Sequence, residues 1–128
     1  MRLLLDTHSF LCFIDGSPKL SSAARSLIED ANNQVYLSVA SLWEMAIKMS
    51  PGKLSLAQQF DVLISEQLSL NRIELLDITV KHAALVAVLP FHHRDPFDRL
   101  LIAQARSEAL PIVGNDAAFD AYVITRLW

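Results

Sequence analysis

Short apolar segments that suit β-strands alternate along the chain with amphipathic segments that suit helices. Strands are expected at 2–6, 34–39, 73–78 and 110–116, with a last apolar piece at 122–128, and helices at 8–14, 21–31, 40–49, 56–70, 80–89 and 96–109. Strands joined through helices need right-handed crossovers, which produce a parallel sheet covered on both faces. We therefore predict an α/β fold, with three α/β/α layers around a central, mainly parallel sheet of four to five strands.

The chain has 128 residues, which is the size of one ordinary domain, so we expect a single domain over 1–128. The longest uncharged apolar run, 83–91, is far shorter than a membrane span, and the N-terminus does not resemble a secretory signal. We therefore expect a cytoplasmic protein with no membrane partner. The single cysteine, Cys12, is expected to be a small buried residue. With a net charge of −3, any nucleic acid would have to be bound locally.

Four acids fall where predicted strands end or the next helices begin. Asp6 ends the first strand and Asp116 follows the fourth. Glu44 and Asp98 lie early in two helices. We expect the four carboxylates to meet at the C-terminal edge of the sheet, with no lysine or arginine fixed between them by the pattern. Carboxylates about 4 Å apart repel by roughly 4 kcal/mol at an effective dielectric near 20, so this arrangement requires a cation. Oxygen ligands without paired Cys or His spacing indicate Mg²⁺ or Mn²⁺, which activates water for phosphodiester hydrolysis.

Each acid also has a structural explanation. An S-x-x-E capping box ends at Glu44, and Asp116 can cap a short helix. We expect no cap role for Asp6, because Thr7 and Ser9 can cap the helix that follows. It is the joint pattern of four acids at one sheet edge that favours a functional site.

The stretch "FHHRDPFDRLLIAQA" at 91–105 is also a helix start. Asp95 fits the N-cap with proline after it, which places Asp98 in the first turn, where the helix dipole favours an acid. His92 and His93 are expected on a loop or surface, because adjacent histidines rarely point at one target and four acids leave them no necessary task.

Other side chains are assigned by their position alone. His82 is expected to be solvated on a helix. Basic residues near the predicted site are candidates for RNA phosphate contacts, with solvated helix faces as the alternative: Lys48, Arg94 and Arg99. Five large apolar residues are expected in the core: Phe10, Phe13, Trp43, Ile47 and Phe60.

Four stretches together cover essentially the whole chain: "LLLDTHSFL", "SVASLWEMAIKMSPGKLSL", "HHRDPFDRLLIAQARSEALPIVGNDAAFDAY" and "VITRLW". In this order they resemble the PIN-domain family, specifically the VapC-type ribonuclease toxins of bacterial toxin–antitoxin pairs. The resemblance implies a parallel sheet flanked by helices and an acidic pocket that holds Mg²⁺ or Mn²⁺ and cuts single-stranded or looped RNA. It also implies a cognate VapB-type antitoxin as partner, whose C-terminal segment binds between the early helices. Some of the five apolar side chains would then be exposed in the free toxin. Homodimers are common in the family.

Matched motif by motif, the four acids of the family fall on Asp6, Glu44, Asp98 and Asp116. The resemblance implies that the three aspartates hold the metal and that Glu44 orients the attacking water or a second ion. Three residues are expected to support the site: Thr7, Asp95 and Asn115.

One position departs from the family pattern. Many relatives carry Thr two places before the fourth acid, where this chain has Gly114, so a hydroxyl is missing and Asn115 is a candidate substitute. Because of this departure, the alternative that the chain is a non-catalytic PIN-like protein-interaction module stays open. A phosphoacceptor receiver domain would also place acids at strand ends, with Asp77 as the acceptor, but "IVGNDAAFDAY" lacks the lysine that it needs.

Overall fold

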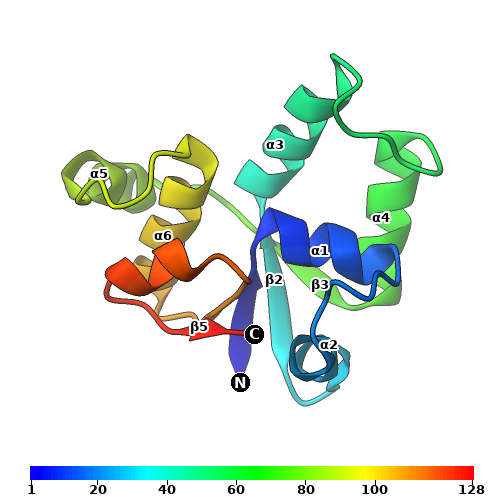
Figure 1. The fold of residues 1–128 in the computed structure, drawn as a ribbon, viewed down its shortest axis with the longest axis horizontal. Helices are drawn as coiled ribbons and strands as arrows, with labels where there is room; N and C mark the ends of the chain where they lie inside the picture. The colour runs from blue at the N-terminus through cyan, green and yellow to red at the C-terminus, as the bar shows by residue number, and fades with distance from the viewer.

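The computed structural model describes residues 1–128 and contains one sheet whose five strands all run parallel (Figure 1). The strands are β1 (Arg2–Leu5), β2 (Gln34–Ser38), β3 (Ile73–Leu76), β4 (Ile112–Val113) and β5 (Arg126–Leu127), in the order β3-β2-β1-β4-β5. β1 is central, because Leu5 pairs with Leu37 on one side and with Val113 on the other. The predicted α/β fold with a parallel central sheet is confirmed.

Helices cover both faces of this sheet. They are α1 (Thr7–Ile14), α2 (Ser22–Glu29), α3 (Val39–Met49), α4 (Phe60–Leu70), α5 (Val80–Val88), α6 (Pro96–Glu108) and a short 3-10 helix, η1 (Ala117–Ala121). The face that includes Leu3 and Leu5 packs with apolar residues of α1, α2, α3 and α4. The face that includes Leu4 packs with α5, α6 and η1. Because successive side chains of a strand point to opposite faces, β1 needs leucine at all three positions.

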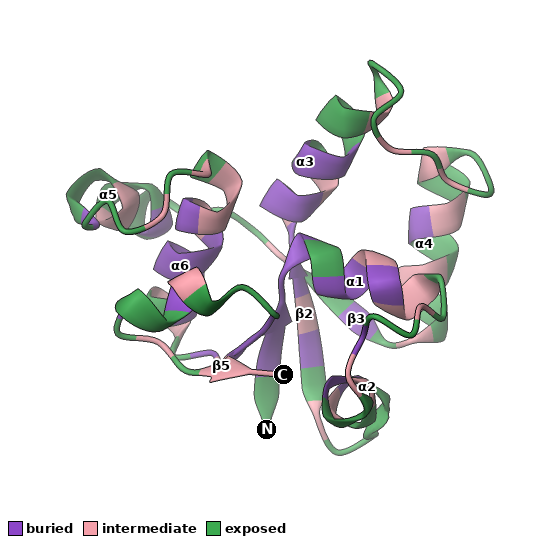
Figure 2. Cartoon of the chain, viewed as in Figure 1, coloured by how far each residue is buried: buried purple, intermediate pink, exposed green.

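Burial follows these layers (Figure 2). The buried residues lie mainly along β1, β2 and β4 and in α1, α3 and α6, whereas α5 is mainly exposed. Cys12 is buried, as predicted. No helix in the structure has the length and apolar character needed to cross a bilayer.

Two helices begin directly where strands end. Asp6 follows β1 and caps α1, with its Oδ1 accepting a hydrogen bond from the backbone N–H of Ser9 at 2.8 Å. Ser38 ends β2 and caps α3. The prediction that Asp6 has no cap role is therefore wrong. Asp6 is the single residue between β1 and α1, so it takes the N-cap position, and Thr7 already lies inside the helix. The capping-box explanation of Glu44 is also wrong, because α3 begins at Val39 and the S-x-x-E stretch lies inside the helix.

His82 is fully buried, so the prediction that it is solvated is wrong. It belongs to a capping box in which its Nδ1 accepts a hydrogen bond from the backbone N–H of Thr79 at 3.1 Å. Its Nε2 lies 2.8 Å from Oε1 of Glu108. Both ring nitrogens thus have partners within the protein, which allows the polar ring to be buried.

The large apolar residues divide between core and surface. Phe10 is fully buried, and Phe13 and Phe60 pack partly buried against the core, as predicted. The prediction is wrong for Trp43 and Ile47, which are 62% and 44% exposed. They lie one turn apart on the side of α3 away from its buried residues, where Trp43 meets only the edge of a neighbouring aromatic ring.

Candidate metal and active site

A cavity of about 410 Å³ opens at the C-terminal edge of the sheet. Its walls come from four segments that are distant in sequence: the start of α1, the middle of α3, the start of α6 and the loop after β4, which converge in Figure 1. The lining residues are Asp6, Thr7, His8, Leu11, Glu44, Lys48, Asp95, Asp98, Asn115 and Asp116. We call this space the acidic cavity. All four predicted carboxylates line it, together with the three residues expected to support them.

Asp6 is the most rigidly held of the four acids. It is 6% exposed, its backbone N–H extends the ladder to Val113 O at 3.1 Å, and its carboxylate caps α1. Burial raises the pKa of Asp6, although the hydrogen bonds from Ser9 oppose this effect. A desolvated carboxylate of this kind gains from a nearby cation.

Gly114 makes the placement of Asp6 possible. A Cβ atom at position 114 would lie 2.7 Å from Oδ2 of Asp6 and 3.3 Å from Cε2 of Phe119. The carboxylate of Asp6 therefore occupies the space that a threonine side chain would need. A threonine at this position would therefore require the Asp6 carboxylate to move from the position it has in this structure.

Glu44 is buried, and both of its oxygens have partners. The hydroxyl of Thr7 donates to Oε1 at 2.7 Å, and Nζ of Lys48 lies 2.5 Å from Oε2. Because the Thr7 hydroxyl has one proton and a carboxylate only accepts, the hydroxyl of Ser41, at 2.9 Å, donates to Thr7. The hydrogen bond to Glu44 raises the pKa of Lys48. The sequence pattern fixed no lysine between the acids, but Lys48, expected near the site, lies one helical turn from Glu44 and pairs with it.

Asp98 lies in the first turn of α6, which Asp95 caps by accepting hydrogen bonds from the backbone N–H groups of Phe97 and Asp98 at 2.8 and 3.1 Å. Burial raises the pKa of Asp98 to about 7, and the negative charges of Asp95, Glu44 and Asp6 add to the increase. At neutral pH the site thus holds more carboxylate charge than its own cations balance, which a divalent cation would correct.

Asp116 caps η1, with Oδ1 accepting a hydrogen bond from the backbone N–H of Ala118 at 2.9 Å. This hydrogen bond is the main reason that the pKa of Asp116 is lowered. Arg126 of β5 fixes the same loop by a two-pronged ion pair with Asp120, at 2.9 and 2.8 Å, and by a hydrogen bond to Gly114 O at 3.2 Å. Arg126 was not identified from the sequence, because its partners belong to a separate loop.

His93 is the residue of the site that sequence reasoning missed. The structure places its side chain, 12% exposed, between two of the acids: Nε2 hydrogen-bonds Oδ2 of Asp116 at 2.8 Å and lies 3.2 Å from Oδ2 of Asp98. His93 lies in a loop, as predicted, but the prediction that it is a surface residue with no task at the site is wrong; His92 is exposed, with its ring roughly perpendicular to that of Tyr122. The sequence contained one signal for this position. His93 precedes Asp95 by two residues, and Asp95 caps the helix that carries Asp98, so His93 is held near the start of that helix.

The three basic candidates differ in availability. Arg94 is exposed, and Lys48 lines the acidic cavity with half of its side chain exposed. Arg99 is 5% exposed, and its guanidinium donates to four backbone carbonyls and lies 4.0 Å from the ring centroid of Phe91. The prediction that Arg99 contacts RNA is wrong, because the side chain is buried and both terminal nitrogens of its guanidinium donate to backbone carbonyls before α6.

The ligand atoms around the acidic cavity are mainly carboxylate oxygens. One atom each from Asp98, Asp116 and His93 lies within 4.8 Å of the others, and Asp6 and Glu44 line the same space. Oxygen-rich sets of this type suit Mg²⁺ and Mn²⁺, whereas structural zinc sites are built from Cys and His. The residues present therefore fit the predicted ion.

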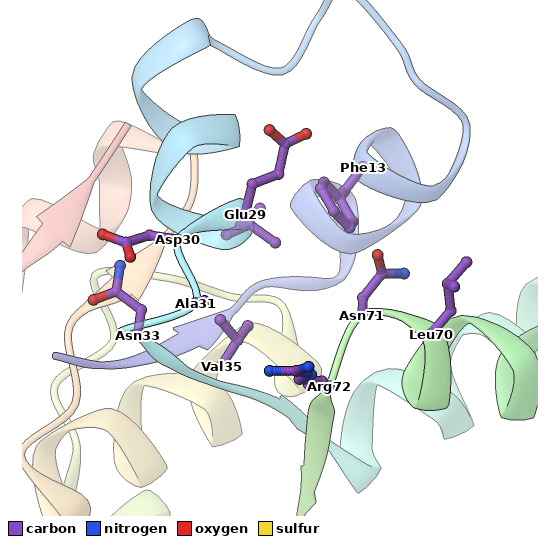
Figure 3. Close-up of a pocket in the computed structure, with 10 residues that line it drawn as sticks. Phe13, Glu29, Asp30, Ala31, Asn33, Val35, Leu70, Asn71 and Arg72 are labelled. Carbon is purple, nitrogen blue, oxygen red and sulfur yellow. The ribbon is translucent and has the colours of Figure 1, made fainter.

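A second cavity, of about 300 Å³, lies at the opposite end of the strands (Figure 3). Its walls come from the ends of α1, α2 and α4 and the beginnings of β2 and β3. The lining residues are Phe13, Ile28, Glu29, Asp30, Ala31, Asn33, Val35, Leu70, Asn71 and Arg72. None of the predicted site residues lies there, so the chemistry is assigned to the acidic cavity.

A family model described as PIN domain matches residues 3–124. Three similar solved structures each share 20% sequence identity with the chain. VapBC2 from Rickettsia felis, bound to a promoter DNA fragment, has a TM-score of 0.76, with 99% of this chain and 98% of that chain covered. FitAcB from Neisseria gonorrhoeae gives 0.61, with 98% and 96% covered. VapBC-5 from Mycobacterium tuberculosis, of the VapBC family of toxin–antitoxin systems, gives 0.60, with 98% and 95% covered. No curated protein matched.

Proposed function

The chain belongs to the PIN domain family, and from this membership and the acidic cavity we propose that it is a metal-dependent endoribonuclease that hydrolyses RNA phosphodiester bonds with Mg²⁺ or Mn²⁺. The observation that carries the proposal is that Asp6, Glu44, Asp98 and Asp116, from four separate segments, line one cavity. The raised pKa of Asp98 supports it, because carboxylates are gathered there at an electrostatic cost that a bound cation would offset.

In this proposal Asp6, Asp98 and Asp116 hold the ion. A bound divalent cation polarises the phosphate and lowers the pKa of a water molecule. Glu44 orients the attacking water, and its own direction is set by Thr7 on one oxygen and Lys48 on the other. Such fixed partners keep a catalytic carboxylate in one orientation before the substrate arrives.

RNA is held locally, since the net charge of the chain is −3. Arg94 is exposed beside the helix start that presents Asp98, and Lys48 lies at the wall of the acidic cavity. We assign phosphate contacts to these two side chains. Asn115, which is exposed and lines the same cavity, is the candidate for a contact to the ion or to the substrate.

The partner in this proposal is a VapB-type antitoxin that neutralises the nuclease in the cytoplasm. It is supported by the similar structures, which include two VapBC systems, and by the exposed Trp43 and Ile47 on α3, which offer apolar surface to another chain. Co-purification with the product of an adjacent reading frame, with loss of RNA cleavage in the complex, tests the pairing. A homodimer is tested separately by light scattering.

The function is tested by RNA cleavage in Mg²⁺ with and without EDTA. Asp98→Asn and Asp6→Asn should each slow cleavage by more than about a hundredfold, because even outer partners of metal ligands contribute roughly 10- to 100-fold. The matched control is Asp61→Asn, an exposed acid in the first turn of α4. Cleavage that persists in EDTA, or at the parent rate in Asp98→Asn, would show that the assignment is wrong.

A further inference from the structure

We propose that His93 is a positioning residue of the acidic cavity: its Nε2–H donates to Asp116 and holds that carboxylate beside Asp98, and it does not itself bind the ion. The inference rests on the proposed function, in which these aspartates are metal ligands. Asp98 and Asp116 belong to different elements, α6 and the loop after β4. Nε2 of His93 lies 2.8 Å from Oδ2 of Asp116 and 3.2 Å from Oδ2 of Asp98.

The backbone selects the tautomer of this ring. Nδ1 of His93 accepts a hydrogen bond from the backbone N–H of Asp95 at 3.2 Å, so Nδ1 carries no proton. The ring proton of the neutral form is therefore on Nε2, where Asp116 accepts it and Oδ2 of Asp98 lies 3.2 Å away. If Nε2 instead bound an ion, the proton would move to Nδ1 and face the N–H of Asp95, donor against donor. The geometry thus favours a donor over a ligand.

The segment that carries His93 is held at several points. The backbone N–H of His93 donates to the Tyr122 hydroxyl at 2.9 Å, and that hydroxyl donates to Pro90 O at 2.7 Å. Arg99 donates to the same carbonyl of Pro90 at 2.9 Å. The His93 ring stacks on Phe119, with centroids 5.6 Å apart and an interplanar angle of 29°. A ring fixed in place and tautomer can hold two acids before the ion arrives.

His82 provides an internal reference. Its Nδ1 also accepts a backbone N–H, from Thr79, and its Nε2 also lies 2.8 Å from a carboxylate, that of Glu108. It is fully buried, and its carboxylate partner, unlike those of His93, does not line the acidic cavity. Nuclear magnetic resonance of ¹⁵N-labelled protein should therefore show two histidines as Nε2–H tautomers, of which only His93 responds to Mg²⁺. A ring of His93 protonated on Nδ1, with Nε2 bare, would overturn the inference.

Binding of the ion is then measured directly. In isothermal titration calorimetry, His93→Ala should bind Mg²⁺ about tenfold more weakly than the parent, and His93→Gln, which retains an N–H donor, should recover most of the affinity. His92→Ala is the matched control and should bind as the parent does. Spin-echo spectra of bound Mn²⁺ should lack the ¹⁴N coupling of a ligated imidazole. Thermal unfolding confirms that each variant is folded.

The outcomes separate this inference from the proposed function. Unchanged or tighter Mg²⁺ binding by a folded His93→Ala, or a ¹⁴N coupling lost in that variant, would overturn the inference alone. A parent that binds Mg²⁺ and shows the His93 dependence, yet cuts no RNA, would support the inference and contradict the proposed function. A parent that binds neither Mg²⁺ nor Mn²⁺ would overturn both.

Discussion

Gly114 lies so close to Asp6 that the two positions act together. A Cβ atom at position 114 would be 2.7 Å from a carboxylate oxygen of Asp6, and that carboxylate is fixed because it caps α1. We expect Gly114→Ala to displace Asp6, to lower the free energy of unfolding by about 1–3 kcal/mol and to weaken Mg²⁺ binding. Urea unfolding and calorimetry check this, with the exposed neighbour variant Asn115→Ala as the control for stability. Parent-like Mg²⁺ binding by Gly114→Ala would contradict the steric argument.

Two arginines five residues apart should behave in opposite ways. Arg99→Met removes hydrogen bonds to four carbonyls, of which Pro90 O keeps the Tyr122 hydroxyl and Val86 O keeps the Leu89 N–H, and we expect it to lower the free energy of unfolding by about 2–4 kcal/mol. Arg94→Met, at an exposed position, should change stability by less than about 0.5 kcal/mol but weaken RNA binding and reduce its salt dependence. RNA binding by each arginine variant is measured in the Asp98→Asn background, so that the RNA is not cut. Undiminished RNA binding by Arg94→Met would remove it from the binding surface.

At the scale of elements, Asp95 at the start of α6 both caps the helix and raises the pKa of Asp98. Asp95 caps two backbone N–H groups, and its charge is, after burial, the largest contribution to the raised pKa of Asp98. Asp95→Asn keeps a capping oxygen and should leave stability nearly unchanged, whereas Asp95→Ala should cost about 0.5–2 kcal/mol. Both should lower the pKa of Asp98 below about 7. Carbon-13 titration of the Asp98 carboxyl checks the second effect, and a pKa unchanged in Asp95→Asn would show that the charge is unimportant.

The elements themselves were largely predictable from local pattern. The strands at β1, β2 and β3 and all six α-helices lie within the predicted ranges or one residue outside them. Errors arose where a side chain found a partner outside its own element. His82 was expected in water but is buried against Glu108 of α6, and Glu44 of α3 was given a capping role although it accepts a hydrogen bond from Thr7 of α1. Helical spacing indicates which face is apolar but not what lies opposite it.

At the scale of the whole molecule, the raised pKa of Asp98 links stability to pH. Between the ordinary aspartate value of 3.8 and about 7, the folded state binds more protons than the unfolded state. The contribution of Asp98 to the free energy of unfolding therefore falls as pH rises through this window, by up to about 1.4 kcal/mol per pH unit. Asp6, whose pKa is also raised, acts in the same direction.

We expect the melting temperature of the metal-free protein to fall from pH 5 to pH 8, and Mg²⁺ to raise it most at pH 8, where Asp98 is ionised. Asp98→Asn should flatten both trends. Calorimetric melting in EDTA and in Mg²⁺ at each pH provides the measurement. Stability that rises over this range in the metal-free parent would contradict the electrostatic description of the acidic cavity.

The sequence by itself determined the α/β fold, the alternation of strands with helices that makes the sheet parallel, and the four acids that gather at one edge of that sheet. These follow from local pattern, because hydrophobic period selects the element and parallel strands place their C-terminal ends together. Only the tertiary structure decided that His93 lies between two acids, that Arg99 is buried on backbone carbonyls and that Gly114 gives Asp6 its space. Those contacts join loops and helices whose relative position depends on the packed core, and no local pattern encodes a distance between two such side chains.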